Sequence, residues 1–133
     1  MNGLRNGKWT TWHENGQKLS ELNWKEGLRE GKMFIWNNNG QKEYMRIYKD
    51  DSIVSEARYT YYSNGQMKEL SNYKGNQWDG KFTNWRENGE LKSEFNYKDN
   101  MRHGKFTWFD RNGQLETEGI YEEDVCISGW CLP

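Results

Sequence analysis

Histidine and cysteine are the residue types in this sequence best suited to bind a metal or act in catalysis. The sequence contains a repeat of about 24 residues, described below, and His13 and His103 stand at unrelated positions within it. They therefore do not form a symmetric site. A metal site needs three or four converging ligands, and the His and Cys spacing matches no zinc pattern. Cys126 and Cys131 would lie about 16 Å apart in a continuous strand. A mutual disulfide would need a bend at 128–129, so we expect two free thiols and no metal.

Carboxylates could serve in acid–base catalysis, but here they have the pattern of a solvated strand face. Glu116 and Glu118 stand two residues apart, as side chains on one side of a strand do. The Gly-Lys and Asn-Gly pairs mark turns, and no glycine-rich phosphate loop occurs. We find no nucleophile paired with a base. The sequence therefore predicts a protein that is not an enzyme and needs no cofactor.

Composition excludes several other classes. Aromatic residues make up 16% of the chain. The 19 basic residues nearly balance the 20 acidic ones, so nucleic-acid binding is not expected. The chain has 14 glycines and 1 proline, which favours turns over helices. No apolar run could span a membrane, and no apolar export signal follows Met1. We expect a cytoplasmic location, with a secreted or cell-surface location as the alternative.

The dipeptide Asn-Gly recurs five times, with its glycines 24, 25, 24 and 24 residues apart. Such a period indicates a repeat architecture. Asn-Gly is a strong hairpin signal, and we predict a type I′ turn at each copy. A second turn follows about ten residues later. The five copies are Asn15-Gly16, Asn39-Gly40, Asn64-Gly65, Asn88-Gly89 and Asn112-Gly113.

Two aromatic positions recur in phase with these turns. Between the turns apolar and polar residues alternate, which is typical of half-buried strands. We predict that the rings form two structural ladders, one ring from every repeat in each. The first ladder is Trp12, Trp36, Tyr61, Trp85 and Phe109, and the second is Trp24, Tyr48, Tyr73, Tyr97 and Tyr121.

The predicted fold class is all-β, an open antiparallel meander of about five 24-residue β-hairpin repeats in a single twisted sheet of about ten strands. One repeat cannot bury enough surface to fold alone, so neighbours must stack. We expect one repeat domain over 1–133, and its start inside a repeat favours a truncated or processed array. The repeats are 7–30, 31–55, 56–79, 80–103 and 104–127, with an N-terminal half-unit at 1–6 and a C-terminal cap at 128–133.

The segment from Gly80 through the Asn-Gly pair at 88–89 to Tyr97 resembles the MORN-repeat variant of the YwqK-type antitoxin family. The resemblance covers about residues 3–125. It implies a β-hairpin repeat without catalytic residues that binds proteins, and in bacteria one that neutralises a toxin encoded beside it. Glu56 departs from the pattern, because the other repeats begin with glycine, and the preceding junction has one extra residue. We expect a bulge or loop there.

Four aromatic residues depart from the repeat and are candidates for partner binding. Trp108 and Tyr62 stand in columns that are polar in most other repeats. Aromatic residues dominate binding hot spots, whereas packing on neighbouring strands is the alternative role. The candidates are Tyr44, Tyr62, Trp78 and Trp108.

The leading functional hypothesis is a non-catalytic protein-binding scaffold, antitoxin-like or immunity-like, that occludes a partner protein such as a cognate toxin. The alternative is a carbohydrate or cell-surface binding module that uses exposed aromatics, although its closest analogues repeat at about twenty residues. Lipid binding is disfavoured because no polybasic patch occurs. Homo-oligomers could form through the open sheet edges.

Overall fold

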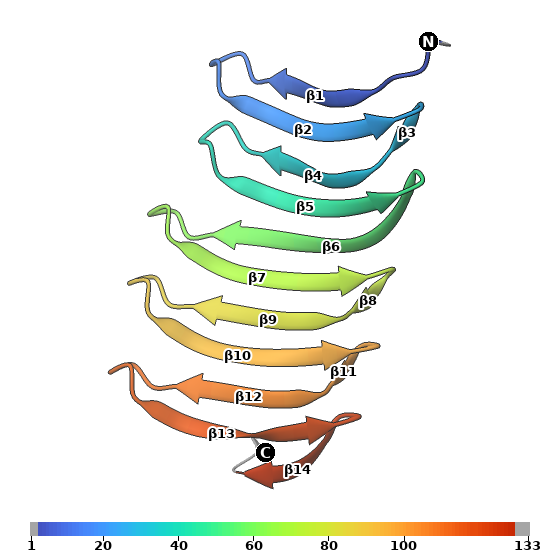
Figure 1. Cartoon of the computed structure of the whole chain (residues 1–133). Helices are drawn as coiled ribbons and strands as arrows, with labels where there is room; N and C mark the ends of the chain where they lie inside the picture. Colours follow the sequence, from blue (N-terminus) through green and yellow to red (C-terminus); the bar gives the residue numbers. More distant parts are fainter. Residues whose placement is uncertain (1–2, 130–133) are drawn as a thin grey trace. The chain divides into compact units, whose positions relative to one another are not determined.

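The computed structural model describes residues 3–129 and confirms the predicted fold class. Fourteen strands form an antiparallel β-sheet meander, and residues 3–129 contain no helix (Figure 1). No helix long and apolar enough to cross a membrane occurs in this range. Parts of the predicted half-unit and cap, at 1–2 and 130–133, lie outside the described residues. The chain divides into two compact units at Arg58, and each is described by itself.

Unit 1 is a meander of hairpins in which each strand pairs antiparallel with the next. Its strand order is β1-β2-β4-β5-β6, and the short β3 pairs with the end of β2. The sixth strand begins in this unit and continues past Arg58. The strands are β1 (Gly7–Trp12), β2 (Lys18–Lys25), β3 (Leu28–Arg29), β4 (Gly31–Trp36), β5 (Lys42–Lys49) and β6 (Ser52–Tyr61).

Unit 2 repeats the same plan. Its order is β7-β9-β10-β12-β13-β14, with the short β8 and β11 paired to β7 and β10. The strands are β7 (Met67–Lys74), β8 (Gln77–Trp78), β9 (Gly80–Trp85), β10 (Leu91–Lys98), β11 (Met101–Arg102), β12 (Gly104–Phe109), β13 (Leu115–Glu122) and β14 (Val125–Gly129).

The Asn-Gly turns connect the strands as predicted, but the predicted turn type is wrong. A type I′ turn needs positive φ at both central residues. Here Gly16 has φ of 90°, whereas Asn15 does not have positive φ. The Gly16 amide donates to the His13 carbonyl, and the His13 amide donates to the Gln17 carbonyl. This is a three-residue loop in which a type I turn is followed by a left-handed glycine, a common hairpin connection.

The type I′ signature instead occurs at the second turn of the repeat. Asp50 and Asp51 have φ of 48° and 69°, and Asp99 and Asn100 have 51° and 70°. These residues tolerate the left-handed region better than most non-glycine residues. Each such turn is also tied to the preceding repeat, because the Asn100 amide donates to the Trp78 carbonyl at 3.0 Å.

The structure has four strands more than the predicted ten: β14 is one, and β3, β8 and β11 arise because the glycine that begins a repeat interrupts its strand. Gly80 and Gly104 have φ of 102° and 85°, which separates β8 from β9 and β11 from β12. A side chain replaces part of the lost ladder. The Asn96 Nδ2 group donates to the Lys105 carbonyl at 2.8 Å. An asparagine therefore stabilises the bulge that the glycine creates.

The junction between β5 and β6 contains the predicted bulge. Tyr48 pairs with Ile53 and Ile47 pairs with Ser55, which leaves Val54 as the extra residue. In the glycine-type junctions the register changes by two residues instead of one, as between β10 and β12. The inserted residue and the smaller bulge each shift the pairing by one residue. The register of β5 with β6 is therefore offset by two residues from the register in the other repeats. An even offset keeps every side chain on its original face.

Cys126 is disulfide-bonded, so the expectation of two free thiols is wrong. Its position in β14 lies shortly before Gly129, which has φ of 89°. The backbone therefore bends at Gly129, within the segment 128–129 where a disulfide between the two cysteines would need a bend. The other cysteine of the sequence, Cys131, lies outside the described residues.

Candidate functional site

The two faces of unit 2 differ in their side chains. Phe82 pairs with Phe95 and Gly80 pairs with Tyr97, so these residues lie on one face. We call it the aromatic face. Its rings include Tyr73, Trp78, Phe82, Phe95, Tyr97, Phe106, Trp108 and Tyr121. The opposite face is called the Trp85 face, because Trp85 follows Gly80 by an odd number of residues.

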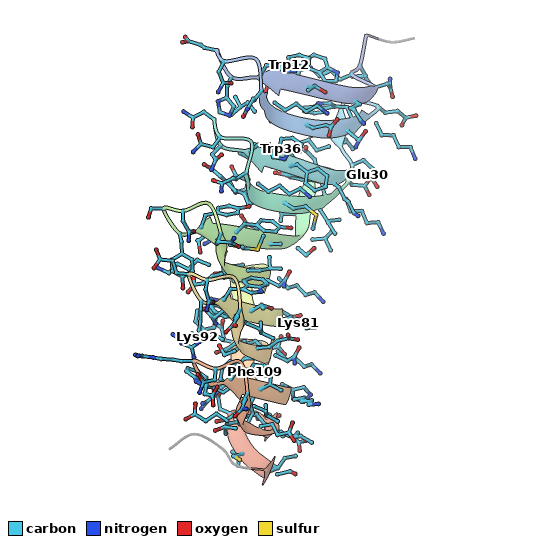
Figure 2. The ribbon with its side chains drawn as sticks, turned by 90° about the vertical axis from the view of Figure 1, so that its left-hand side faces the viewer. Trp12, Glu30, Trp36, Lys81, Lys92 and Phe109 are labelled. Atoms are coloured by element: carbon cyan, nitrogen blue, oxygen red, sulfur yellow. The ribbon has the colours of Figure 1, made fainter. Side chains whose placement is uncertain are left out.

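Figure 2 shows the two faces edge-on, with Lys92 and Lys81 projecting to opposite sides of the ribbon. Lys92 reaches the aromatic face, where its Nζ lies 5.7 Å from the Trp108 ring centroid. Lys81 belongs to the Trp85 face and forms an ion pair with Glu94 at 2.8 Å. This ion pair therefore lies on the face opposite to the ring clusters.

The first ring cluster of the aromatic face joins three strands. The Trp78 centroid lies 5.0 Å from that of Tyr97 and 5.5 Å from that of Phe82. The rings of Tyr97 and Trp78 meet edge to face, at 83°. Burial raises the pKa of the Tyr97 hydroxyl. Trp78 itself remains 39% exposed. The cluster thus has two half-buried rings beneath one ring that is open to solvent.

The second ring cluster is centred on Phe106, which is 1% exposed. Its ring stacks on Phe95 at 5.4 Å and lies 5.0 Å from Tyr121. Trp108 meets Phe95 edge to face at 6.1 Å. Phe95 pairs with Phe82 across the strands. The two clusters are therefore neighbours on the aromatic face.

A cation clamp closes one end of this surface. The Arg102 guanidinium lies 4.3 Å from the Tyr121 ring centroid, and its Nη1 donates to the Tyr121 hydroxyl at 3.3 Å. Its Nε lies 3.0 Å from Asp124 Oδ1. The Arg102 backbone amide donates to that same oxygen at 2.8 Å. The Asp124 pKa is lowered, first by the backbone amide and then by the guanidinium.

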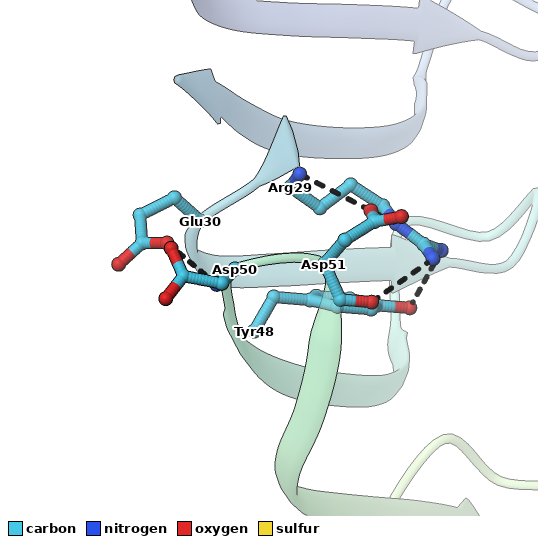
Figure 3. Close-up of polar contacts among 5 residues, drawn as sticks. All are labelled: Arg29, Glu30, Tyr48, Asp50 and Asp51. Carbon is cyan, nitrogen blue, oxygen red and sulfur yellow. Dashed lines mark hydrogen bonds and ion pairs between the residues drawn. The ribbon is translucent and has the colours of Figure 1, made fainter. Parts of the chain in front are cut away.

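Unit 1 contains the same clamp, drawn in Figure 3. Arg29 lies 4.4 Å from the Tyr48 ring centroid and 2.6 Å from Asp51 Oδ1. The guanidinium of Arg29 lowers the pKa of Asp51. Beside it, Glu30 Oε2 accepts a hydrogen bond from the Asp50 amide at 2.9 Å. In both units the clamp links one repeat to the next at spacings of 19 and 22 residues.

Trp78 occupies the position that arginine holds in these clamps. It stands 19 residues before Tyr97, as Arg102 stands before Tyr121. Its backbone amide donates to Asn100 Oδ1 at 2.7 Å, as that of Arg102 does to Asp124. Asparagine has replaced aspartate where the cation is absent. Trp78 therefore replaces the arginine of a clamp that recurs in other repeats.

The four candidate binding residues have different environments. Trp78 and Trp108 both lie on the aromatic face. Tyr62 donates its hydroxyl proton to the Trp85 carbonyl at 2.7 Å, a bond between repeats. His13 makes the equivalent contact, with its Nε2 2.9 Å from the Trp36 carbonyl oxygen.

Tyr44 lies in β5 of unit 1, where the Arg46 guanidinium is 4.5 Å from its ring centroid. Its cross-strand neighbours are Ile35 and Arg58. It therefore packs against a cationic side chain of its own unit.

The two sets of predicted ladder rings lie on opposite faces of their strands. Members of the second set face the repeat-starting glycines, as in the pair formed by Tyr48 and Gly31. Members of the first set follow these glycines by five residues, which is an odd interval. Burial differs widely among these rings, since Tyr48 is 3% exposed and Trp12 is 59% exposed. Trp36 stacks on Phe34 at 5.6 Å, in its own strand.

Sequence reasoning did not assign a role to Phe82, Phe95 and Phe106, which join the ladder residues to one another. One signal was present. An apolar residue stands two positions after the starting glycine in four repeats. Those residues are Trp9, Met33, Phe82 and Phe106.

The side chains of the aromatic face are of the kinds that take part in binding rather than in metal chemistry. Among residues 3–129 no group of three His, Cys, Asp or Glu side chains could hold a metal ion. The face instead combines the exposed indole of Trp78 and the half-buried indole of Trp108 with the cations of Lys92 and Arg102. Indole, phenol and guanidinium groups contribute most to protein–protein hot spots.

Comparison with known families identifies the repeat. Four segments match the model of the MORN repeat variant, and together they cover more than half of the chain. They are residues 5–26, 57–74, 78–99 and 102–123. No curated protein matches the sequence.

Proposed function

Since this chain belongs to the MORN repeat variant family, we propose that it is a non-catalytic scaffold that binds a partner protein through the aromatic face of unit 2. The observation that carries this proposal is the exposed Trp78 ring, seated on the half-buried rings of Tyr97 and Phe82. A large rigid aromatic on a preorganised base loses little conformational freedom on binding.

The rest of the surface supports the same role. Trp108 provides a second indole, and Lys92 and Arg102 supply charges beside the rings. A central apolar patch with a polar border is the usual anatomy of a protein interface. Charges at the border orient the partner and raise the association rate.

Within this role we propose an antitoxin-like or immunity-like action. The scaffold would lie across the active surface of a toxin and block it by steric occlusion. An open sheet face suits that task because it covers area without needing a pocket. The partner would be encoded by a neighbouring gene.

The test is co-purification of the chain with the neighbouring gene product, followed by a measurement of Kd. Replacing Trp78 and Trp108 by alanine should weaken binding by about thirtyfold or more, since hot-spot truncations cost about 2 kcal/mol or more. Trp12→Ala is the matched control, because this exposed indole lies in unit 1. Equal affinity for the double variant would refute the assigned surface. Retention on cell-wall polysaccharide instead of protein would favour the carbohydrate-binding alternative.

The compartment is part of the proposal. Disulfide bonds persist in oxidising compartments and are rare in the cytosol. The bonded state of Cys126 thus supports the secreted or cell-surface location over the cytoplasmic one. Thiol labelling of the protein in intact cells and in lysed cells would distinguish the two.

A further inference from the structure

The five Asn-Gly turns share a reactive dipeptide, because glycine leaves its backbone nitrogen sterically open to the preceding side chain. When that nitrogen attacks the asparagine Cγ, a succinimide forms. The reaction requires the carboxamide to swing toward the glycine nitrogen. Anything that anchors the carboxamide elsewhere slows the reaction. The side-chain hydrogen bonds of the five asparagines therefore determine how fast each one forms a succinimide.

In three turns the carboxamide is anchored. Asn15 Nδ2 donates to the Asn38 carbonyl at 2.7 Å, and its Oδ1 accepts from the Gln17 amide at 3.0 Å. Asn64 has the same two bonds, at 2.9 Å each, to the Glu87 carbonyl and the Gln66 amide.

Asn88 has one such bond, since its Oδ1 accepts from the Glu90 amide at 3.0 Å. The glycines that follow these three asparagines all have φ of 90°. The three turns therefore share one geometry.

The other two turns are built differently. In the turn at 37–41, Asn37 Oδ1 accepts from the amides of Asn39 and Gln41. It takes over the role that the Asn-Gly asparagine has elsewhere. Within residues 3–129 the structure shows no hydrogen bond from the Asn39 carboxamide. Gly40 has φ of 82°.

The turn at 110–114 repeats this arrangement. Asp110 Oδ1 accepts from the amides of Asn112 and Gln114, at 2.8 and 3.0 Å. Gly113 also has φ of 82°. The Asn112 carboxamide has no hydrogen bond to any residue in the described part of the chain. An Asn or Asp two residues before the Asn-Gly pair is the sequence mark of this turn.

We propose that Asn39 and Asn112 are sites of spontaneous modification in the folded protein, where each deamidates to a mixture of aspartate and isoaspartate. The Gly40 or Gly113 nitrogen loses its proton and bonds to the asparagine Cγ. The bond from Cγ to Nδ2 breaks, and ammonia leaves with the proton. Water then opens the succinimide at either carbonyl. No atom is oxidised or reduced, and each event adds one negative charge.

The hydrogen bonds predict an order of rates. One net hydrogen bond of about 1 kcal/mol lowers the reactive population by about fivefold. Asn88 should therefore react about fivefold more slowly than Asn39 and Asn112. Asn15 and Asn64, with two bonds each, should react about twenty-five-fold more slowly.

The experiment is incubation of the full chain in mildly alkaline buffer, with peptide mapping by mass spectrometry over time. Folded protein should show modification first at Asn39 and Asn112. In denaturant all five sites should react at similar rates, because the anchoring bonds are lost. Uniform rates in the folded protein, or the same rank order in denaturant, would overturn the proposal.

Two substitutions test the cause. Asn37→His installs the residue type of the first turn and should slow Asn39 while leaving Asn112 unchanged. Asp110→Arg copies the fourth turn and should slow Asn112 alone. Because the substitutions lie in separate units, loss of folding in one leaves the other informative. An unchanged rate at the targeted site in a folded variant would contradict the assignment.

Discussion

Replacing Phe106 by alanine tests whether the aromatic face holds unit 2 together. The ring is 1% exposed and lies within 5.4 Å of both Phe95 and Tyr121, measured between centroids. A buried phenylalanine removes about 150 to 250 Å² from water, worth about 4 to 6 kcal/mol at about 25 cal/mol per Å². Such transfer sums are upper bounds, and core Phe→Ala changes cost about 3 to 5 kcal/mol. We expect a loss in that range.

The measurement is urea unfolding followed by tryptophan fluorescence. The matched control is Leu115→Ala in the same unit, because this side chain is 48% exposed and should cost about 1 kcal/mol. Domains are stabilised by only about 5 to 15 kcal/mol, so Phe106→Ala should lower the midpoint strongly. Equal losses for the two variants would refute the view that ring packing on this face stabilises the unit.

Three further predictions concern single contacts, each read from urea unfolding. Gly119→Ala should cost about 1 to 3 kcal/mol, because the new methyl would lie 2.5 Å from a β14 backbone oxygen and 2.7 Å from the Phe106 ring, and an unchanged midpoint would contradict this packing. Since the folded pKa of Asp124 is lowered, its contribution should be present above the usual value of about 3.9 and be lost as the pH falls through the folded value. The stability gap to Asp124→Asn should therefore close in acid, and a gap independent of pH would exclude the ionic contact with Arg102. Tyr62→Phe should cost about 0.5 to 1.5 kcal/mol through the lost hydroxyl bond, and no loss would show that the bond is not formed in solution.

The repeat period was sufficient to predict the fold class because it located turns and strands together. Period-two alternation indicated the strands, and Asn-Gly located the hairpins. The turn type was not predictable from the dipeptide alone. Asn-Gly fits both a two-residue type I′ turn and a three-residue loop with a left-handed glycine, and only the backbone bonds to His13 and Gln17 distinguish them.

The candidate site was predicted only in part. Trp78 and Trp108 stood out because they break the repeat, and both lie on the aromatic face. The role of Phe106 was missed because it obeys the repeat and therefore does not stand out. The clamps were missed because Arg102 and Asp124 lie 22 residues apart, and only the stacking of successive repeats brings them together.

The junction between β5 and β6 has a consequence for how such arrays can vary. The chain gained one residue there and the bulge is one residue smaller, so Ala57 and Arg58 lie on the same faces as their counterparts in the other repeats. A lone insertion without that compensation would invert the inside and outside of the strand that follows. An insertion of one residue in this repeat should therefore occur together with a bulge that is one residue smaller. In this chain the second change is visible in the sequence as Glu56, which stands where the other repeats have glycine.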